Sequence, residues 1–140
     1  MEIAFLDANV LFSAAFGPDS NVAKLWDLKG VQLITSAYAL DEARRNLRKP
    51  EHRTNLQSLM AAVTIVAESA EPIEGVAVPN IAEKDRPVLY AAVAARATHL
   101  VTGDTRHFGL FYGKSIAGVT ILPPAQYLRL HSPSVPDSPQ

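Results

Sequence analysis

The order of apolar and polar positions along the chain predicts short buried strands separated by helices. Residues 3–6 (Ile-Ala-Phe-Leu) are apolar without alternation, which is the pattern of an interior strand covered on both faces. Further apolar runs of strand length occupy residues 31–35, 63–66, 98–102 and 119–122. The pattern therefore predicts five strands.

The segments between these runs carry helical spacing or helix-start signals. Ser36 is a good N-cap for a helix whose apolar stripe is Leu40, Ala43 and Leu47. Pro87 suits the first turn of another helix. We expect helices at about residues 10–15, 22–28, 37–49, 51–62, 85–96, 106–108 and 123–130. This alternation of strands and helices predicts an α/β fold, a parallel sheet with right-handed crossovers and helices on both faces.

Length and composition are typical of one domain. The chain has 140 residues, of which 48% are hydrophobic, enough to fill a single core. We expect the domain to cover residues 1–130. Residues 131–140, rich in proline and serine without periodicity, are expected to be a disordered tail. Residues 68–79, with several glutamates and two prolines, are expected to form a surface loop.

Charge and residue types narrow the partners and cofactors. The formal net charge of −1 gives no overall attraction for nucleic acid, so polyanion binding would need a local basic patch or metal ions. The chain has no cysteine, which excludes disulfides, thiolate zinc sites and cysteine nucleophiles. The sequence has no signal-peptide pattern and no apolar run of membrane-spanning length. We therefore expect a cytoplasmic protein without a membrane partner.

Acidic residues recur where the predicted elements meet one edge of the sheet. Asp7 follows the first predicted strand and Asp104 follows the fourth, and the carboxyl ends of parallel strands form the edge where ligands bind. Asp85 shares a face with the apolar residues of the helix that it opens. Glu42 borders the apolar stripe of helix 37–49 and is expected to face inward or nearly so. Each residue alone is explained as a helix cap, but we expect all four to converge on this edge.

Four carboxylates in one depression repel one another, so we expect a cation between them and, without metal, a raised pKa for at least one. Hard oxygen ligands, with no histidine expected nearby, favour Mg²⁺ or Mn²⁺ over zinc. Such an ion activates water and neutralises charge in phosphodiester hydrolysis. We expect Asp7 and Asp104 to be the primary ligands, because both leave rigid strand ends, and Asp85 to complete the site. Glu42 either binds metal through water or orients the attacking water as a base.

A basic run follows Glu42. Five of the chain's 13 basic residues lie within ten positions: Arg44, Arg45, Arg48, Lys49 and Arg53. Two interpretations remain open, a solvated helix face and a phosphate-binding patch.

Four segments of the chain, in order, resemble the motifs of PIN-domain ribonucleases. They are residues 5–11 (FLDANVL), Glu42 followed by residues 45–47 (RNL), residues 84–89 (KDRPVL) followed by 91–92, and residues 99–104 (HLVTGD) followed by 106–108 (RHF). The resemblance spans residues 3 to about 130. It implies a PIN-like three-layer α/β/α sandwich with a five-stranded parallel sheet in the order 3-2-1-4-5.

The same resemblance implies an activity, a site and partners. The activity is metal-dependent endonucleolytic cleavage of RNA that leaves a 5′-phosphate. Asp7, Glu42, Asp85 and Asp104 would form the acidic site, and Asn9 and Thr102 would support it by hydrogen bonding. Many small PIN proteins are VapC-type toxins, each neutralised by an antitoxin encoded beside it, and they commonly dimerise. An RNA substrate, a cognate antitoxin and a homodimer are therefore the expected partners, and the basic run would hold the RNA backbone.

Two other function classes remain open. A HAD-type phosphatase also places an aspartate after the first strand but needs a second one two residues later, where this chain has Asn9. A catalytically silent module could keep the fold for RNA binding or as a protein adaptor. The presence of all four carboxylates argues against that module.

Overall fold

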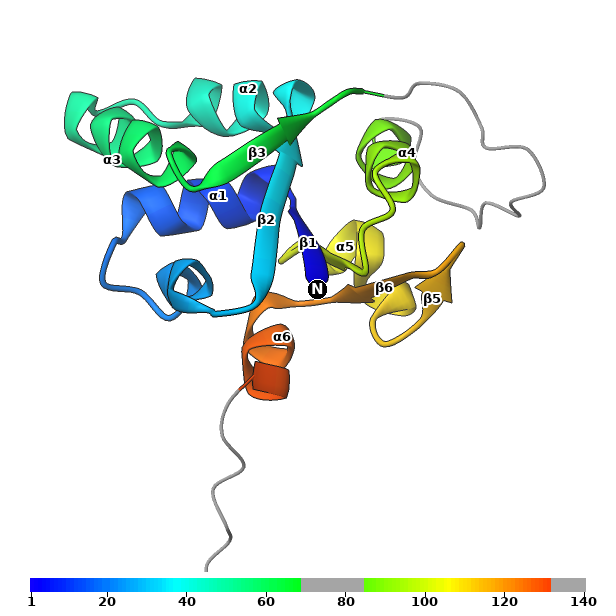
Figure 1. Ribbon diagram of the computed structural model, residues 1–140. Helices are drawn as coiled ribbons and strands as arrows, with labels where there is room; N and C mark the ends of the chain where they lie inside the picture. Colours follow the sequence, from blue (N-terminus) through cyan, green and yellow to red (C-terminus); the bar gives the residue numbers. More distant parts are fainter. Residues whose placement is uncertain (69–84, 132–140) are drawn as a thin grey trace, which may run out of the picture.

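The computed structural model describes residues 1–68 and 85–131 and forms a sheet between helical layers (Figure 1). The strands are β1 (Glu2–Leu6), β2 (Val31–Ser36), β3 (Val63–Val66), β4 (His99–Val101), β5 (Ser115–Ile116) and β6 (Val119–Leu122). Their order is β3-β2-β1-β4-β6-β5. Neighbours pair in parallel, except that β5 pairs antiparallel with β6. The predicted order 3-2-1-4-5 is confirmed for the five predicted strands, and β5 is an addition.

The sixth strand is a two-residue edge strand. It is joined to β6 by Ala117 and Gly118, whose φ angles are 52° and 87°, and positive φ at both central residues is what a type I′ hairpin turn requires. Two residues are too short to show the alternation that identifies a strand in a sequence, so the sequence pattern does not predict β5.

The helices form a layer on each face of the sheet. They are α1 (Ala8–Phe16), the 3₁₀ helix η1 (Val22–Asp27), α2 (Ala37–Asn46), α3 (Pro50–Met60), α4 (Arg86–Ala94), α5 (Thr105–Phe108), the 3₁₀ helix η3 (Gly109–Phe111) and α6 (Pro124–His131). In Figure 1, α1, α2 and α3 lie together on one side of β2, and α4 and α5 lie on the other. The expected three-layer α/β/α arrangement is confirmed.

Successive residues of β1 pack alternately into two separate hydrophobic cores. Ala4 and Leu6 pack in the core that α1, α2, α3 and α6 cover, whereas Phe5 packs with α4 and α5. All three side chains have no exposed surface. The strand therefore needs apolar residues on both faces, which is why its sequence shows no alternation.

Helix α2 ends earlier than predicted. Leu47 is extended (φ −89°, ψ 116°), and Arg53 Nε donates a hydrogen bond of 2.6 Å to its carbonyl oxygen. Pro50 then occupies the first turn of α3, where its missing N–H costs nothing. The basic run is consequently divided between α2, the following turn and α3.

Two predicted segments fall largely outside the described residues. Of the expected surface loop at residues 68–79, the structure describes Glu68, and of the expected tail at residues 131–140 it describes His131. His131 ends α6 instead of opening a disordered tail. No helix in the described ranges is both long and apolar enough for a membrane span.

A buried hydrogen bond ties β2 to the end of β1. Thr35 has no exposed surface, and its Oγ1 donates to the Leu6 carbonyl at 2.7 Å. We predict that Thr35→Val lowers the free energy of unfolding by about 1 kcal/mol, since the replacement keeps the shape and removes the donor. Urea unfolding of Thr35→Val beside Thr64→Val, at an exposed position of β3, provides the measurement. Equal stability of the two variants would contradict the prediction.

Candidate metal centre

Asp7 is a buried carboxylate at the point where β1 ends and α1 begins. Its Oδ1 accepts a hydrogen bond from Ala8 N at 2.7 Å, and its Oδ2 accepts one from Thr102 Oγ1 at 2.8 Å and one from Asn9 Nδ2 at 3.2 Å. The residue is 7% exposed. Asp7 is therefore the helix cap that the simpler interpretation expected, and it also turns one oxygen toward the end of β4.

Asn9 and Thr102 connect Asp7 to the segment that carries Asp104. Asn9 Oδ1 accepts from Gly103 N at 2.6 Å, and Thr102 Oγ1 accepts from Asp104 N at 3.1 Å. Because each side chain contacts both Asp7 and the backbone after β4, the two strand ends are held in a fixed relation.

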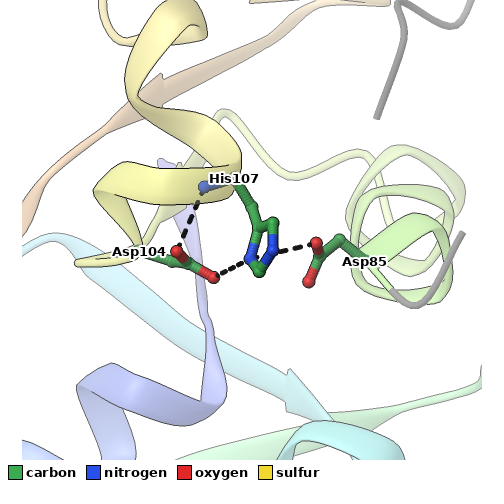
Figure 2. Close-up of side chains that lie close together, drawn as sticks. All are labelled: Asp85, Asp104 and His107. Atoms are coloured by element: carbon green, nitrogen blue, oxygen red, sulfur yellow. Dashed lines mark hydrogen bonds and ion pairs between the residues drawn. The ribbon is translucent and has the colours of Figure 1, made fainter. Parts of the chain in front are cut away.

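Asp85, Asp104 and His107 form a compact group at the same edge (Figure 2). Asp104 caps α5 through Oδ1, which accepts from His107 N at 3.1 Å. Its Oδ2 lies 2.6 Å from His107 Nδ1, and the same nitrogen lies 3.4 Å from Asp85 Oδ2. One ligand atom from each residue lies within 4.8 Å of the other two. The imidazole thus stands between two carboxylates that come from separate elements.

The presence of His107 corrects the expectation that no histidine lies near the site. Helix α5 begins directly after its cap residue Asp104, so the third residue of the helix returns to the cap. The signal in the sequence was an aspartate followed three residues later by a histidine at a strand-to-helix junction. The sequence predicted a short helix over residues 106–108 but no role for His107 in the site.

Glu42 is exposed on α2, which corrects the expectation that it faces inward or nearly so. The buried residues of α2 are Ala39, Leu40 and Ala43, and the position of Glu42 beside this stripe leaves it exposed. With Asn9 and other residues it lines a hollow of about 320 Å³. Glu42 therefore lies at the rim of this hollow, where solvent reaches its carboxylate.

Burial raises the pKa of Asp7 to about 6 from its usual 3.8. The hydrogen bonds from Thr102 and Ala8 act in the opposite direction, and the negative charges of Glu42 and Asp85 add to the rise. The sequence analysis expected a raised carboxyl pKa from charge repulsion. Loss of hydration is the largest cause, and repulsion from Glu42 and Asp85 is a smaller one.

The donor set of this group fits a divalent cation. Carboxylate oxygens are hard ligands that suit Mg²⁺ and Mn²⁺, and an imidazole nitrogen is a ligand that transition ions accept more readily than Mg²⁺. Asp85, Asp104 and His107 are therefore the residues that could hold a divalent cation.

The five basic residues after Glu42 are distributed over α2, the turn that follows it and α3. Arg45 Nε pairs with Asp41 Oδ2 at 3.0 Å on the exposed side of α2. Arg44 and Arg53 line a hollow between α2 and α3. Arg48 and Lys49 line a different hollow beside the end of α1.

Comparisons with known proteins agree with this architecture. A family model described as PIN domain matches residues 4–106. The solved structure described as VapBC2 from Rickettsia felis, bound to a DNA fragment from their promoter, contains a chain of the same fold, with a TM-score of 0.60 and 16% sequence identity. The match covers 86% of this chain and 98% of that one. No curated protein matches the sequence.

The family match includes every acidic position of the site. Asp7, Glu42, Asp85 and Asp104 all lie within residues 4–106, and the matched range is well over half of the 140 residues. The chain belongs to the PIN-domain family.

Proposed function

We propose that this protein is a metal-dependent endoribonuclease that hydrolyses RNA phosphodiester bonds. The observation that carries the proposal is that hydrogen bonds and close contacts connect Asp7, Asp104 and Asp85 at one edge of the sheet, called the acidic edge below. The buried carboxylate of Asp7 is bonded through Thr102 to the segment that presents Asp104, and Asp104 shares His107 with Asp85. An RNA substrate would place the activity in the cytoplasm.

The four carboxylates have different surroundings and therefore different proposed roles. Asp85 and Asp104 would hold Mn²⁺ or Mg²⁺ together with His107, and Asp7 would contribute from the buried side. When bound, the ion supplies positive charge to the phosphate and favours ionisation of a water molecule. Asn9 and Thr102 keep Asp7 oriented through their hydrogen bonds.

Glu42 is the carboxylate best placed to act on water, because it is exposed at the rim while the others are partly or fully buried. It would orient the attacking water and accept its proton. The water oxygen then bonds to phosphorus, the bond from phosphorus to the 3′ oxygen breaks, and the 3′ oxygen leaves as a hydroxyl after protonation. The products are a 5′-phosphate and a 3′-hydroxyl.

We further propose that the protein is the toxin of a type II toxin–antitoxin pair. The structural likeness to a chain in a VapBC2 complex supports a cognate antitoxin as partner, and a homodimer is proposed on the same family grounds. A HAD-type phosphatase does not agree with the PIN-domain match. A silent RNA-binding or adaptor module is the second candidate, which the cleavage assay below tests.

Glu42 and its neighbour Asp41 offer a matched pair for that assay. Both are exposed on α2, but Asp41 pairs with Arg45 and is not among the residues that line the hollow beside Glu42. We predict that Glu42→Gln lowers kcat for cleavage of mixed single-stranded RNA in Mn²⁺ by about 10²-fold or more, the usual loss for a general base. Asp41→Asn should stay near the wild-type rate. Undiminished cleavage by Glu42→Gln would contradict the proposed role of Glu42. Cleavage by wild type in excess EDTA would contradict the proposed metal dependence.

The raised pKa of Asp7 makes stability depend on pH. The folded state binds this proton more readily than the unfolded chain, so the stabilising contribution is complete below about pH 4 and is lost as pH rises through about 6. A pKa difference of about two corresponds to about 3 kcal/mol at neutral pH.

We predict that Asp7→Asn removes this dependence in metal-free protein. Wild type should lose stability relative to the variant between pH 4 and pH 7.5, by up to about 3 kcal/mol. Loss of the acceptor for Thr102 costs the variant about 1 kcal/mol at every pH, so it should be the less stable protein at pH 4 and the more stable at pH 7.5. Urea unfolding in EDTA, with Asp41→Asn as control, measures the difference. Parallel pH profiles for wild type and Asp7→Asn would contradict the prediction.

Metal binding should stabilise the folded protein, and it should stabilise variants that lack one of the proposed ligand side chains less than wild type. At 100 times its dissociation constant an ion adds about 2.7 kcal/mol. We predict that Mn²⁺ raises the melting temperature of wild type, and raises it less in Asp104→Asn and in His107→Ala. The imidazole should contribute more to the binding of Mn²⁺ than to that of Mg²⁺. His107→Ala should therefore reduce the difference between the rises in melting temperature that the two ions cause. Equal stabilisation of all three proteins by Mn²⁺ would contradict a role of Asp104 and His107 as metal ligands and leave them with a structural role.

A further inference from the structure

Three rings, those of Phe12, Phe16 and His52, form a series along α1 and onto α3 in which Phe12 and His52 are half-buried and Phe16 is exposed. The rings of Phe12 and Phe16 stack with centroids 5.7 Å apart and an interplanar angle of 22°, and the rings of Phe16 and His52 lie 4.5 Å apart at 45°. Phe16 is 58% exposed. We propose that Phe16 and His52, flanked by Arg48 and Lys49, bind an unpaired RNA base next to the scissile phosphate. This inference rests on the proposed ribonuclease function.

This series of rings is continuous with the candidate site. Asn9, Phe12 and Phe16 are spaced i, i+3 and i+7, so they share one face of α1. Asn9 and Phe12 line the hollow that contains Glu42 and Asn46. Asn46 also lines the next hollow, of about 190 Å³, together with Phe16. At 1.5 Å per residue, Phe16 lies about 10 Å along the helix from Asn9, which suits a nucleotide that flanks the cleaved bond.

The second hollow combines the two chemistries that single-stranded RNA requires. Its lining residues are Phe16, Asn46, Leu47, Arg48, Lys49 and His52. The rings offer flat apolar surface on which any base can stack, and the two cations are placed for its phosphates. A chain with a net charge of −1 attracts RNA through such local charge and not through its overall field. No carboxylate is among these lining residues, which favours a polyanion as the occupant.

Single exposed apolar side chains are common on protein surfaces and need no function. Phe16 differs because it is part of a series of rings and lies beside two cations. An apolar peptide segment would use the same rings but gains nothing from Arg48 and Lys49. The small volume of the hollow also suits one planar group better than a row of side chains, so the observations favour a base.

Hydrogen bonds hold the platform in place before any ligand arrives. Asn55 Nδ2 donates to the Ala15 carbonyl at 3.0 Å, which fixes α3 against the last turn of α1. Arg53 Nε donates to the Leu47 carbonyl at 2.6 Å and fixes the turn that carries Arg48 and Lys49. A preformed surface loses little conformational freedom on binding.

The test uses short single-stranded RNA in which one nucleotide at a time lacks its base but keeps its phosphate. Binding is measured in EDTA, so no cleavage occurs, and any repulsion from the acidic edge is the same for every probe. For one position, wild type should bind the complete RNA roughly 5- to 150-fold tighter than the abasic RNA, the range for stacking on one aromatic residue. Phe16→Leu should lose most of that difference, and Phe16→Tyr should keep it. Leu130→Ala, an exposed apolar position on α6, is the surface control and should behave as wild type.

The cations are tested by the dependence of binding on salt. Replacing both Arg48 and Lys49 by Gln should reduce the slope of log affinity against log salt by about one for each phosphate that the variant no longer neutralises. Lys29→Gln, at an exposed position just before β2, should leave the slope unchanged. An unchanged slope in the double variant would overturn the placement of phosphates at this hollow.

The outcomes separate this inference from the proposed function. If wild type binds complete and abasic RNA equally at every position, or does not bind RNA, the stacking site is wrong, whether or not Mn²⁺-dependent cleavage is found. If binding depends on the base and on Phe16 but wild type cleaves no RNA in Mn²⁺, the stacking site stands and the nuclease function falls. A loss of binding in Phe16→Leu that is equal for both RNAs would point to a base-independent contact, such as peptide docking, and would also overturn the inference.

Discussion

The buried carboxylate of Asp7 is the constraint on which the arrangement of the site depends. Its hydrogen bonds to Ala8, Asn9 and Thr102 join the end of β1 to the end of β4. Burial raises its pKa to about 6, so at neutral pH the folded protein holds an ionised group in surroundings that disfavour it. Apolar packing on both faces of β1 supplies the stability that keeps this charge in place.

Much of this arrangement follows from the sequence because the strands are short, apolar and regularly separated. Residues 63–66 and 119–122 were predicted with the observed bounds of β3 and β6. The carboxyl ends of parallel strands share an edge, and because β1 pairs with β4 Asp7 lies close to the segment of Asp104. The topology of the sheet therefore accounts for the positions of Asp7 and Asp104, independently of side-chain conformation.

The remaining half depends on local geometry that periodicity does not encode. Whether Glu42 faces the core or the solvent is decided by a rotation of one position around α2. His107 reaches the site because α5 starts without an intervening residue after its cap. The division of the basic residues follows from the end of α2 at Asn46 and from the bond between Arg53 and Leu47. Each of these depends on a single helix boundary, and boundaries are the least certain part of a sequence-based assignment.

Helix capping and metal binding are compatible here because a carboxylate has two oxygens. Asp7 caps α1 with Oδ1 and offers Oδ2 to Thr102. Asp104 likewise caps α5 with Oδ1 and directs Oδ2 to His107. Asp85 stands at the N-cap position of α4 without a side-chain capping bond, and its Oδ2 faces the same imidazole. A cap bond fixes the rotamer of a carboxylate through the backbone, so a cation that binds the second oxygen has less side-chain entropy to overcome. The capping that looked like an alternative to function therefore also orients Asp7 and Asp104 toward the proposed metal site.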